Sequence, residues 1–136
     1  MTVPDNKRLL QAAFAALAGG DGRKLLDCMA EDFTWTVLGT TPWSGRYAGK
    51  HAVRRDLFAP LLAQFAGPYT NQALRFVAEG DVVVVECRGR AETRAGQRYD
   101  NEYCYVCRFA DGLMVELTEY LDTALVERVL APRAVP

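Results

Sequence analysis

Apolar positions recur every three to four residues in three stretches of the chain, which predicts three helices in its first half. The stretches lie at about 5–17, 21–29 and 49–65. Asp5 is a suitable cap for the first helix, and Gly19 and Gly20 follow its end. Pro60 falls inside the third stretch and is expected to kink or divide that helix.

The apolar pattern changes to a period of two in other parts of the chain, which predicts strands. Phe33, Trp35 and Val37 alternate with threonines and predict one strand before a loop that runs to Gly45. Four more strands are expected at 69–79, 82–93, 98–109 and 113–122, joined by short Gly-containing turns. A last short helix is expected from Thr123 to about Leu130.

This order of elements predicts an α+β fold in a single domain, residues 1–136. Three helices pack on one face of a curved, mostly antiparallel sheet, and the last four strands are consecutive neighbours. Because such a sheet curls around its helices, the cone-shaped fold leaves an apolar cavity at one end, which is a usual form of small-ligand site.

Charge and composition exclude several classes of partner. The net charge is −1 and no long run of one sign occurs, so a nucleic-acid or membrane surface is not expected. The chain start shows no apolar leader, and we expect a cytoplasmic protein. Four cysteines are expected to be reduced, because they lie inside strongly periodic segments of a chain that shows no secretion signal. Cys104 and Cys107 are not expected to form a redox pair, because they point to opposite faces of one strand.

Five short segments resemble the SnoaL-like domain family of the nuclear transport factor/ketosteroid isomerase-like superfamily. They are Ala18–Asp21, Trp43–Gly45, Glu79–Asp81, Ala110–Gly112 and Glu119–Asp122. The resemblance covers nearly the whole chain and implies the cone-shaped fold. The segments mark turns and element boundaries, so they say little about chemistry.

The residues that the superfamily's enzymes use are mostly absent here. Resemblance to the ketosteroid isomerases places Thr36, Ala13 and Tyr105 near the base and the two proton donors, so two of the three groups are missing. Resemblance to limonene epoxide hydrolase leaves only its last-strand carboxylate with a counterpart, Glu119. The SnoaL-type cyclases use a single acidic base near that same position.

Glu119 is the main candidate catalytic residue. Leu117 and Leu121 share its face of the last strand, so alternation turns its carboxyl inward among hydrophobic side chains. Burial there disfavours the charged form and raises the pKa into a range suited to acid–base work. Tyr103 is the second candidate. A tight turn at Asp111 and Gly112 would instead place Cys104 opposite Glu119, but a bulged sheet favours Tyr103.

Other aromatic and polar residues are candidates for binding the ligand. They are Trp35, Trp43, Tyr47 and Asn101. Aromatic walls suit a planar, apolar ligand. A chain with one histidine, His51, offers few partners for a metal site, so no metal is expected. No cofactor is expected either. The sheet face that bears Thr118 and Tyr120 is expected to form a homodimer.

Two functions remain open from the sequence. The first is a cofactor-independent isomerase, cyclase or lyase in which Glu119 moves a proton on an apolar carbonyl compound, with Tyr103 or Asn101 as hydrogen-bond donor. The alternative is a non-catalytic ligand-binding or dimeric scaffold domain.

Overall fold

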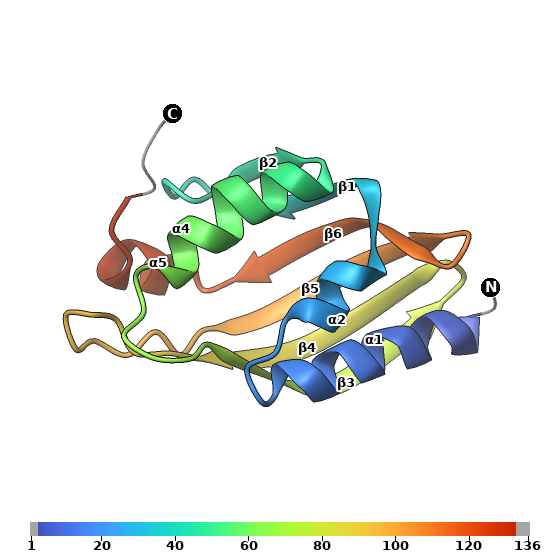
Figure 1. Ribbon diagram of the computed structural model, residues 1–136, viewed down its shortest axis with the longest axis horizontal. Coiled ribbons are helices and arrows are strands. Elements are labelled where there is room, and N and C mark those ends of the chain that lie inside the picture. Colours follow the sequence, from blue (N-terminus) through green and yellow to red (C-terminus); the bar gives the residue numbers. More distant parts are fainter. Residues whose placement is uncertain (1–2, 133–136) are drawn as a thin grey trace.

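The computed structural model describes residues 3–132 and shows one curved sheet of six strands with its helices gathered on the concave side (Figure 1). The strands, in chain order, are β1 (Met29–Val37), β2 (Gly45–Ala48), β3 (Thr70–Glu79), β4 (Val82–Arg90), β5 (Glu102–Ala110) and β6 (Leu113–Leu121). Their order across the sheet is β2-β1-β6-β5-β4-β3.

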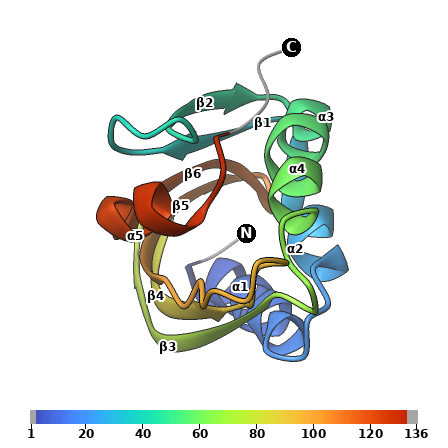
Figure 2. The same ribbon diagram turned by 90° about the vertical axis from the view of Figure 1, so that its left-hand side faces the viewer.

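The helices divide into three groups. They are α1 (Val3–Leu17) and α2 (Arg23–Cys28), then the consecutive turns α3 (Lys50–Ala52), η1 (Val53–Phe58) and α4 (Ala59–Leu62), and finally α5 (Thr123–Val129). Seen end-on, the sheet forms a C-shape, with α1 inside the curve of β3 and β4, and α2 and α4 across its open side (Figure 2). This is the α+β cone that the sequence predicts.

The four strands of the second half are consecutive antiparallel neighbours, as predicted. The early strand β1 lies beside β6 and is parallel to it, with Trp35 opposite Leu117 and Val37 opposite Glu119. This pairing brings the beginning and the end of the chain together in the middle of the sheet. It therefore fixes the inward residues of β1 against those of β6.

Several element boundaries differ from the sequence prediction. Strand β2 was not predicted, because a four-residue edge strand carries almost no alternation of its own. Residues 91–93 and 98–101, expected to be strand, belong instead to a loop with isolated bridges such as Glu92 to Arg98. Helix α1 begins at Val3, so Asp5 lies in its first turn and is not its cap. Met29 begins β1 and does not belong to the preceding helix.

The third helix changes its hydrogen-bonding pattern just before Pro60. Residues Val53–Phe58 form a π-helical turn, and α-helical geometry resumes at Ala59. Proline has no N–H to donate and its ring crowds the carbonyl four residues earlier, so a wider turn at this point avoids both problems. Leu57 and Phe58, both in the π turn, face the interior of the cone.

Two leucines of β6 differ in burial and show which of its side chains face the core. Leu117 is 1% exposed, whereas Leu113 on the same strand is 42% exposed. We expect Leu117→Ala to lower the free energy of unfolding by about 2–5 kcal/mol, because it leaves a cavity in the core. Leu113→Ala, the matched control, should change it by less than about 0.5 kcal/mol in the same chemical denaturation experiment. Equal losses would contradict the observed face assignment.

Candidate functional site

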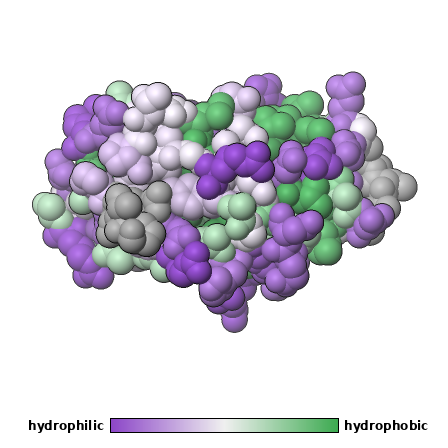
Figure 3. Space-filling model, turned by 90° about the horizontal axis from the view of Figure 1, so that it is seen from above, coloured by the Kyte–Doolittle hydropathy of each residue, from purple (hydrophilic) through white to green (hydrophobic). Residues whose placement is uncertain are grey.

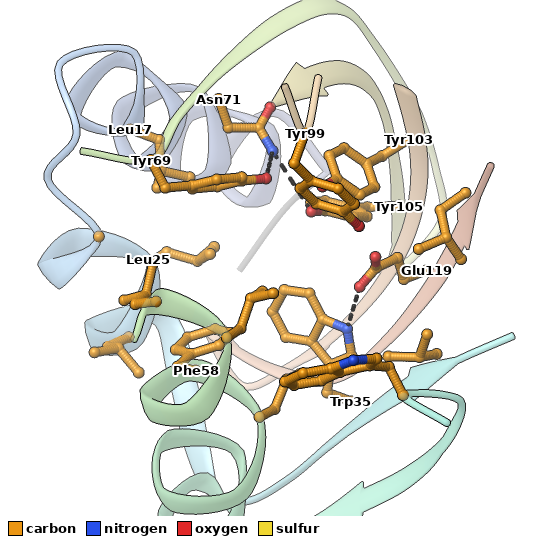
Figure 4. Close-up of a pocket in the computed structure, with 18 of the residues that line it drawn as sticks. Leu17, Leu25, Trp35, Phe58, Tyr69, Asn71, Tyr99, Tyr103, Tyr105 and Glu119 are labelled. Atoms are coloured by element: carbon orange, nitrogen blue, oxygen red, sulfur yellow. Dashed lines mark hydrogen bonds between the residues drawn. The ribbon is translucent and has the colours of Figure 1, made fainter. Parts of the chain in front are cut away.

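A cavity of about 310 Å³ lies between the concave face of the sheet and the helices (Figure 4). One wall comes from the strands and the segments leading into them, and the other from helices α1, α2, η1, α4 and α5. Most lining side chains are aliphatic or aromatic. The polar groups that reach the cavity from the sheet side are Tyr69, Asn71, Tyr99, Tyr103, Tyr105 and Glu119.

Glu119 points into this cavity from β6 and is 8% exposed. The indole Nε1 of Trp35 donates a hydrogen bond of 2.8 Å to its Oε1. Trp35 is the only hydrogen-bond partner of the carboxyl among residues 3–132. Burial raises the pKa of Glu119 from 4.5 to about 7, and the hydrogen bond from Trp35 opposes this rise only in part.

Four tyrosines surround the part of the cavity that faces Glu119. They are Tyr69, Tyr99, Tyr103 and Tyr105. Burial raises the pKa of each phenol, to about 12 for Tyr99 and well above the ordinary value of 10 for Tyr69, Tyr103 and Tyr105. At neutral pH all four therefore keep their protons and act as hydrogen-bond donors, whereas Glu119 is close to half ionised.

Asn71, near the start of β3, connects two of these phenols. Its Nδ2 donates to the hydroxyl of Tyr69 at 3.1 Å and to that of Tyr105 at 3.5 Å. The Asn71 side chain is 2% exposed. Figure 4 shows Asn71 on the side of the cavity opposite Trp35 and Phe58, with Glu119 between these two sides.

The register of β5 and β6 corrects the sequence prediction for Tyr103. Tyr105 pairs with Glu119, and Tyr103 pairs with Leu121. The sheet is bulged, as expected, but the extra residue is Val115 in β6, which moves the pairing in the opposite direction. Tyr103 still lines the cavity, because residues two apart on a strand share a face.

The predicted ligand-binding residues are only partly brought together. Trp35 and Trp43 line the cavity, whereas Tyr47 and Asn101 do not. Tyr47 is buried beneath the loop after β1 and donates from its hydroxyl to the Trp43 carbonyl at 2.7 Å. Asn101 is fully buried and joins the start of β5 to the end of β6 through two hydrogen bonds with the Asp122 backbone.

Helix α5 and the residue that follows it form one end of the cavity, through Val126 and Leu130. The residue after Leu130, Ala131, is held by three hydrogen bonds. Its carbonyl accepts from Trp43 Nε1 at 2.9 Å and from Gln64 Nε2 at 3.1 Å, and its N–H donates to Gln64 Oε1 at 2.9 Å. Two loops from other parts of the chain thus fix this wall in place.

Sequence analysis did not single out Tyr69 and Asn71 as site residues. Both lie at the entry to β3, before the strand's apolar pattern begins, and tyrosine and asparagine beside Gly67 and Pro68 are typical of a loop. Tyr99 and Tyr105 belong to the alternating tyrosines that the sequence displayed, but only the register places Tyr105 beside Glu119.

Within residues 3–132, no group of three or more His, Cys, Asp or Glu side chains is arranged to hold a metal ion. The same part of the chain contains no helix with the length and apolar character needed to cross a membrane. Cys104 and Cys107 alternate between the outer and inner faces of β5, as their spacing predicts, and all four cysteines are free thiols.

Solved structures with the same architecture confirm the fold. Bal32a, from a soil-derived mobile gene cassette, superimposes with a TM-score of 0.82 at 22% identity, covering 95% of this chain and 98% of its own. TerC, co-crystallised with polyporic acid, gives 0.78 at 19% identity, covering 92% and 97%. A putative SnoaL-like polyketide cyclase from Jannaschia sp. CCS1 gives 0.76 at 19% identity, covering 98% and 94%.

These identities establish a shared fold and not a shared activity. A sequence search of curated proteins gives no match. The profile of the SnoaL-like domain matches residues 10–117, which is well over half of the chain. The chain therefore belongs to the SnoaL-like domain family.

Proposed function

We propose that this protein binds a small apolar carbonyl compound in its cavity and that Glu119 moves a proton on that compound, as in a cofactor-independent isomerase or cyclase. The observation that carries the proposal is the buried Glu119 carboxyl, which opens onto an apolar cavity and has a pKa raised to about 7 by burial. A general base works best when its pKa lies near the working pH.

The tyrosines supply the second part of the chemistry. Removing a proton beside a carbonyl group places negative charge on the carbonyl oxygen, and fixed donors stabilise that charge in a site that excludes water. The raised pKa values of Tyr69 and Tyr105 keep their hydroxyls protonated for this role. Tyr103 contributes a third phenol to the same wall, whereas Asn101 lies outside the cavity and holds strands together.

The shape and chemistry of the walls support a flat, apolar ligand. Rings from Trp35, Phe58 and the tyrosines enclose the cavity, and ring faces favour planar molecules. Arg23 is the one cationic residue in the lining, and its side chain is exposed and paired with Asp21. The neighbour TerC was co-crystallised with polyporic acid, and another neighbour is named as a putative SnoaL-like polyketide cyclase.

The alternative is a non-catalytic binding or scaffold domain. It is favoured by the Trp35–Glu119 hydrogen bond, which joins β1 to β6 and can serve stability alone. In that case Glu119 has a structural role, and changing it alters folding without altering any reaction.

The catalytic proposal predicts a specific loss of proton exchange. We expect the protein to accelerate deuterium exchange at the α-carbon of 2-tetralone in D₂O, measured by proton NMR, and Glu119→Gln to slow it by about 100-fold or more. The rate should rise as pH rises through about 7, because the carboxylate is the basic form. Glu116→Gln makes the same change at an exposed position on β6 and is the control. Equal rates in the two variants would favour the scaffold alternative.

The raised pKa of Glu119 also predicts a pH-dependent stability cost. The folded state holds the proton up to about pH 7, whereas the unfolded state loses it near 4.5, so this group's contribution to stability falls as pH rises through that interval. The full loss is about 3 kcal/mol. Glu119→Gln should therefore be more stable than the wild type at pH 8 and nearly equal to it at pH 4.5, by urea denaturation. A constant difference at both pH values would argue against a perturbed Glu119.

We further propose that the outer face of the sheet joins two copies of the chain. The register aligns Val77, Val84, Val106 and Thr118 in one row across β3 to β6. Val77 is 54% exposed, and the nearby Tyr120 is 49% exposed. The surface above β1, β2 and α4 is by contrast mostly hydrophilic, with apolar side chains gathered toward one end (Figure 3).

Three valines in this row are half-buried or exposed on an open sheet face, which is typical of a dimer contact. We expect the wild type to sediment as a dimer at micromolar concentrations and Val106→Lys to sediment as a monomer with an unchanged circular dichroism spectrum. A monomeric wild type at high micromolar concentration would remove the dimer from the proposal.

A reducing compartment, such as the cytoplasm, is the proposed location. All four cysteines are free, and Cys28, Cys87 and Cys107 are buried. Burial raises the pKa of the Cys107 thiol, which makes it a poor nucleophile. Thiols kept in this form need no disulfide partner.

A further inference from the structure

The hydroxyl of Tyr69 is held by residues on two neighbouring strands. Asn71 on β3 and Gly89 on β4 are paired across the sheet. Asn71 Nδ2 donates to the Tyr69 hydroxyl at 3.1 Å. A Cβ atom at Gly89 would lie 2.6 Å from the same hydroxyl oxygen and 3.0 Å from the Tyr103 ring. One strand therefore supplies a hydrogen bond to this hydroxyl, and the other leaves room for it.

The Asn71 amide is not arranged for stability alone. Its Oδ1 is buried and has no hydrogen-bond partner in the part of the chain that the structure describes. A buried acceptor without a partner costs about 1–3 kcal/mol. The amide nevertheless directs its Nδ2 to Tyr69 and Tyr105, and such exceptions in a folded protein call for an explanation.

The hydrogen bonds of Asn71 determine what the two phenols can offer to the cavity. An amide N–H can only donate, so the oxygens of Tyr69 and Tyr105 act as acceptors toward Asn71. Each phenol still has its own O–H. One of these two protons can go to the other phenol, but the second then has no acceptor within the pair and is available to a ligand.

We propose that Asn71 and Gly89 are positioning residues that make Tyr69 and Tyr105 a donor pair, and that this pair selects ligands with a carbonyl oxygen over the corresponding alcohols. A carbonyl oxygen and an alcohol oxygen can both accept the O–H left over by the pair. The alcohol also brings an O–H of its own, for which the pair has no acceptor left, because both phenol oxygens already accept from Asn71. The inference rests on the proposed function for the class of ligand, but it does not require proton transfer by Glu119.

The test compares two flat molecules that differ only at the oxygen-bearing carbon, 9-fluorenone and 9-fluorenol. The ketone has no hydrogen on the carbons next to its carbonyl group that a base could remove to form an enol, so binding is measured without reaction. Dissociation constants come from quenching of tryptophan fluorescence, since Trp35 and Trp43 line the cavity. We expect the wild type to bind the ketone about fivefold more tightly than the alcohol, because the alcohol's own O–H is left without an acceptor in the site.

Asn71→Asp replaces the amide donor by acceptor oxygens, so the phenols turn their protons toward Asp and away from the cavity. The ketone preference should disappear or reverse. Gln72→Glu is the matched control, because it makes the same type of change at the next, exposed position of β3. The double variant Tyr69→Phe/Tyr105→Phe removes both donors and keeps both rings, and it decides the question if Asn71→Asp does not fold.

An unchanged ketone preference in folded Asn71→Asp, or in Tyr69→Phe/Tyr105→Phe, would overturn the inference, as would a wild type without any preference. The proposed function fails separately. If Glu119→Gln exchanges the 2-tetralone protons as fast as the wild type while Asn71→Asp loses the ketone preference, the donor pair stands and the catalytic role of Glu119 does not.

Discussion

The parallel pairing of β1 with β6 is the constraint on which the site depends. Residues 84 positions apart in the chain, Trp35 and Glu119, form a hydrogen bond only because these two strands are neighbours. The same pairing closes the sheet around the helices and places the inward side chains of both strands on one cavity wall. Without it, β6 would be the edge strand of a meander, and its carboxyl would face water at a normal pKa.

The cavity separates acid–base chemistry from hydrogen bonding by position. The one carboxyl on the sheet side lies beside an indole N–H, which stabilises the charged form only partly against burial. The phenols lie on another part of the wall and are further from ionising. Burial favours the neutral form of both kinds of group. It brings the pKa of the Glu119 carboxyl near neutrality, where it can accept a proton, and it moves the pKa values of the phenols away from neutrality, so that they stay donors.

Much of the fold could be predicted from the sequence, because alternation on β5 and β6 is long and regular. The alternation on β6 predicted that Glu119 and Leu117 share the inward face, and both side chains are buried. The register could not be predicted, since a one-residue bulge at Val115 leaves no pattern of its own yet changes every pairing beyond it. The roles of Tyr69 and Asn71 depend on contacts across β3, β4 and β5, which local sequence does not encode.

Helix α5 has a consequence for the order in which the cavity becomes complete. It lies beyond all six strands in the chain and, with the residue that follows it, contributes Val126 and Leu130 to the end of the cavity, where Ala131 is fixed to Trp43 and Gln64. A ribosome therefore finishes the whole sheet before it makes this wall. A chain that ended after β6 would keep every strand of the sheet but would lack the residues that line this end of the cavity.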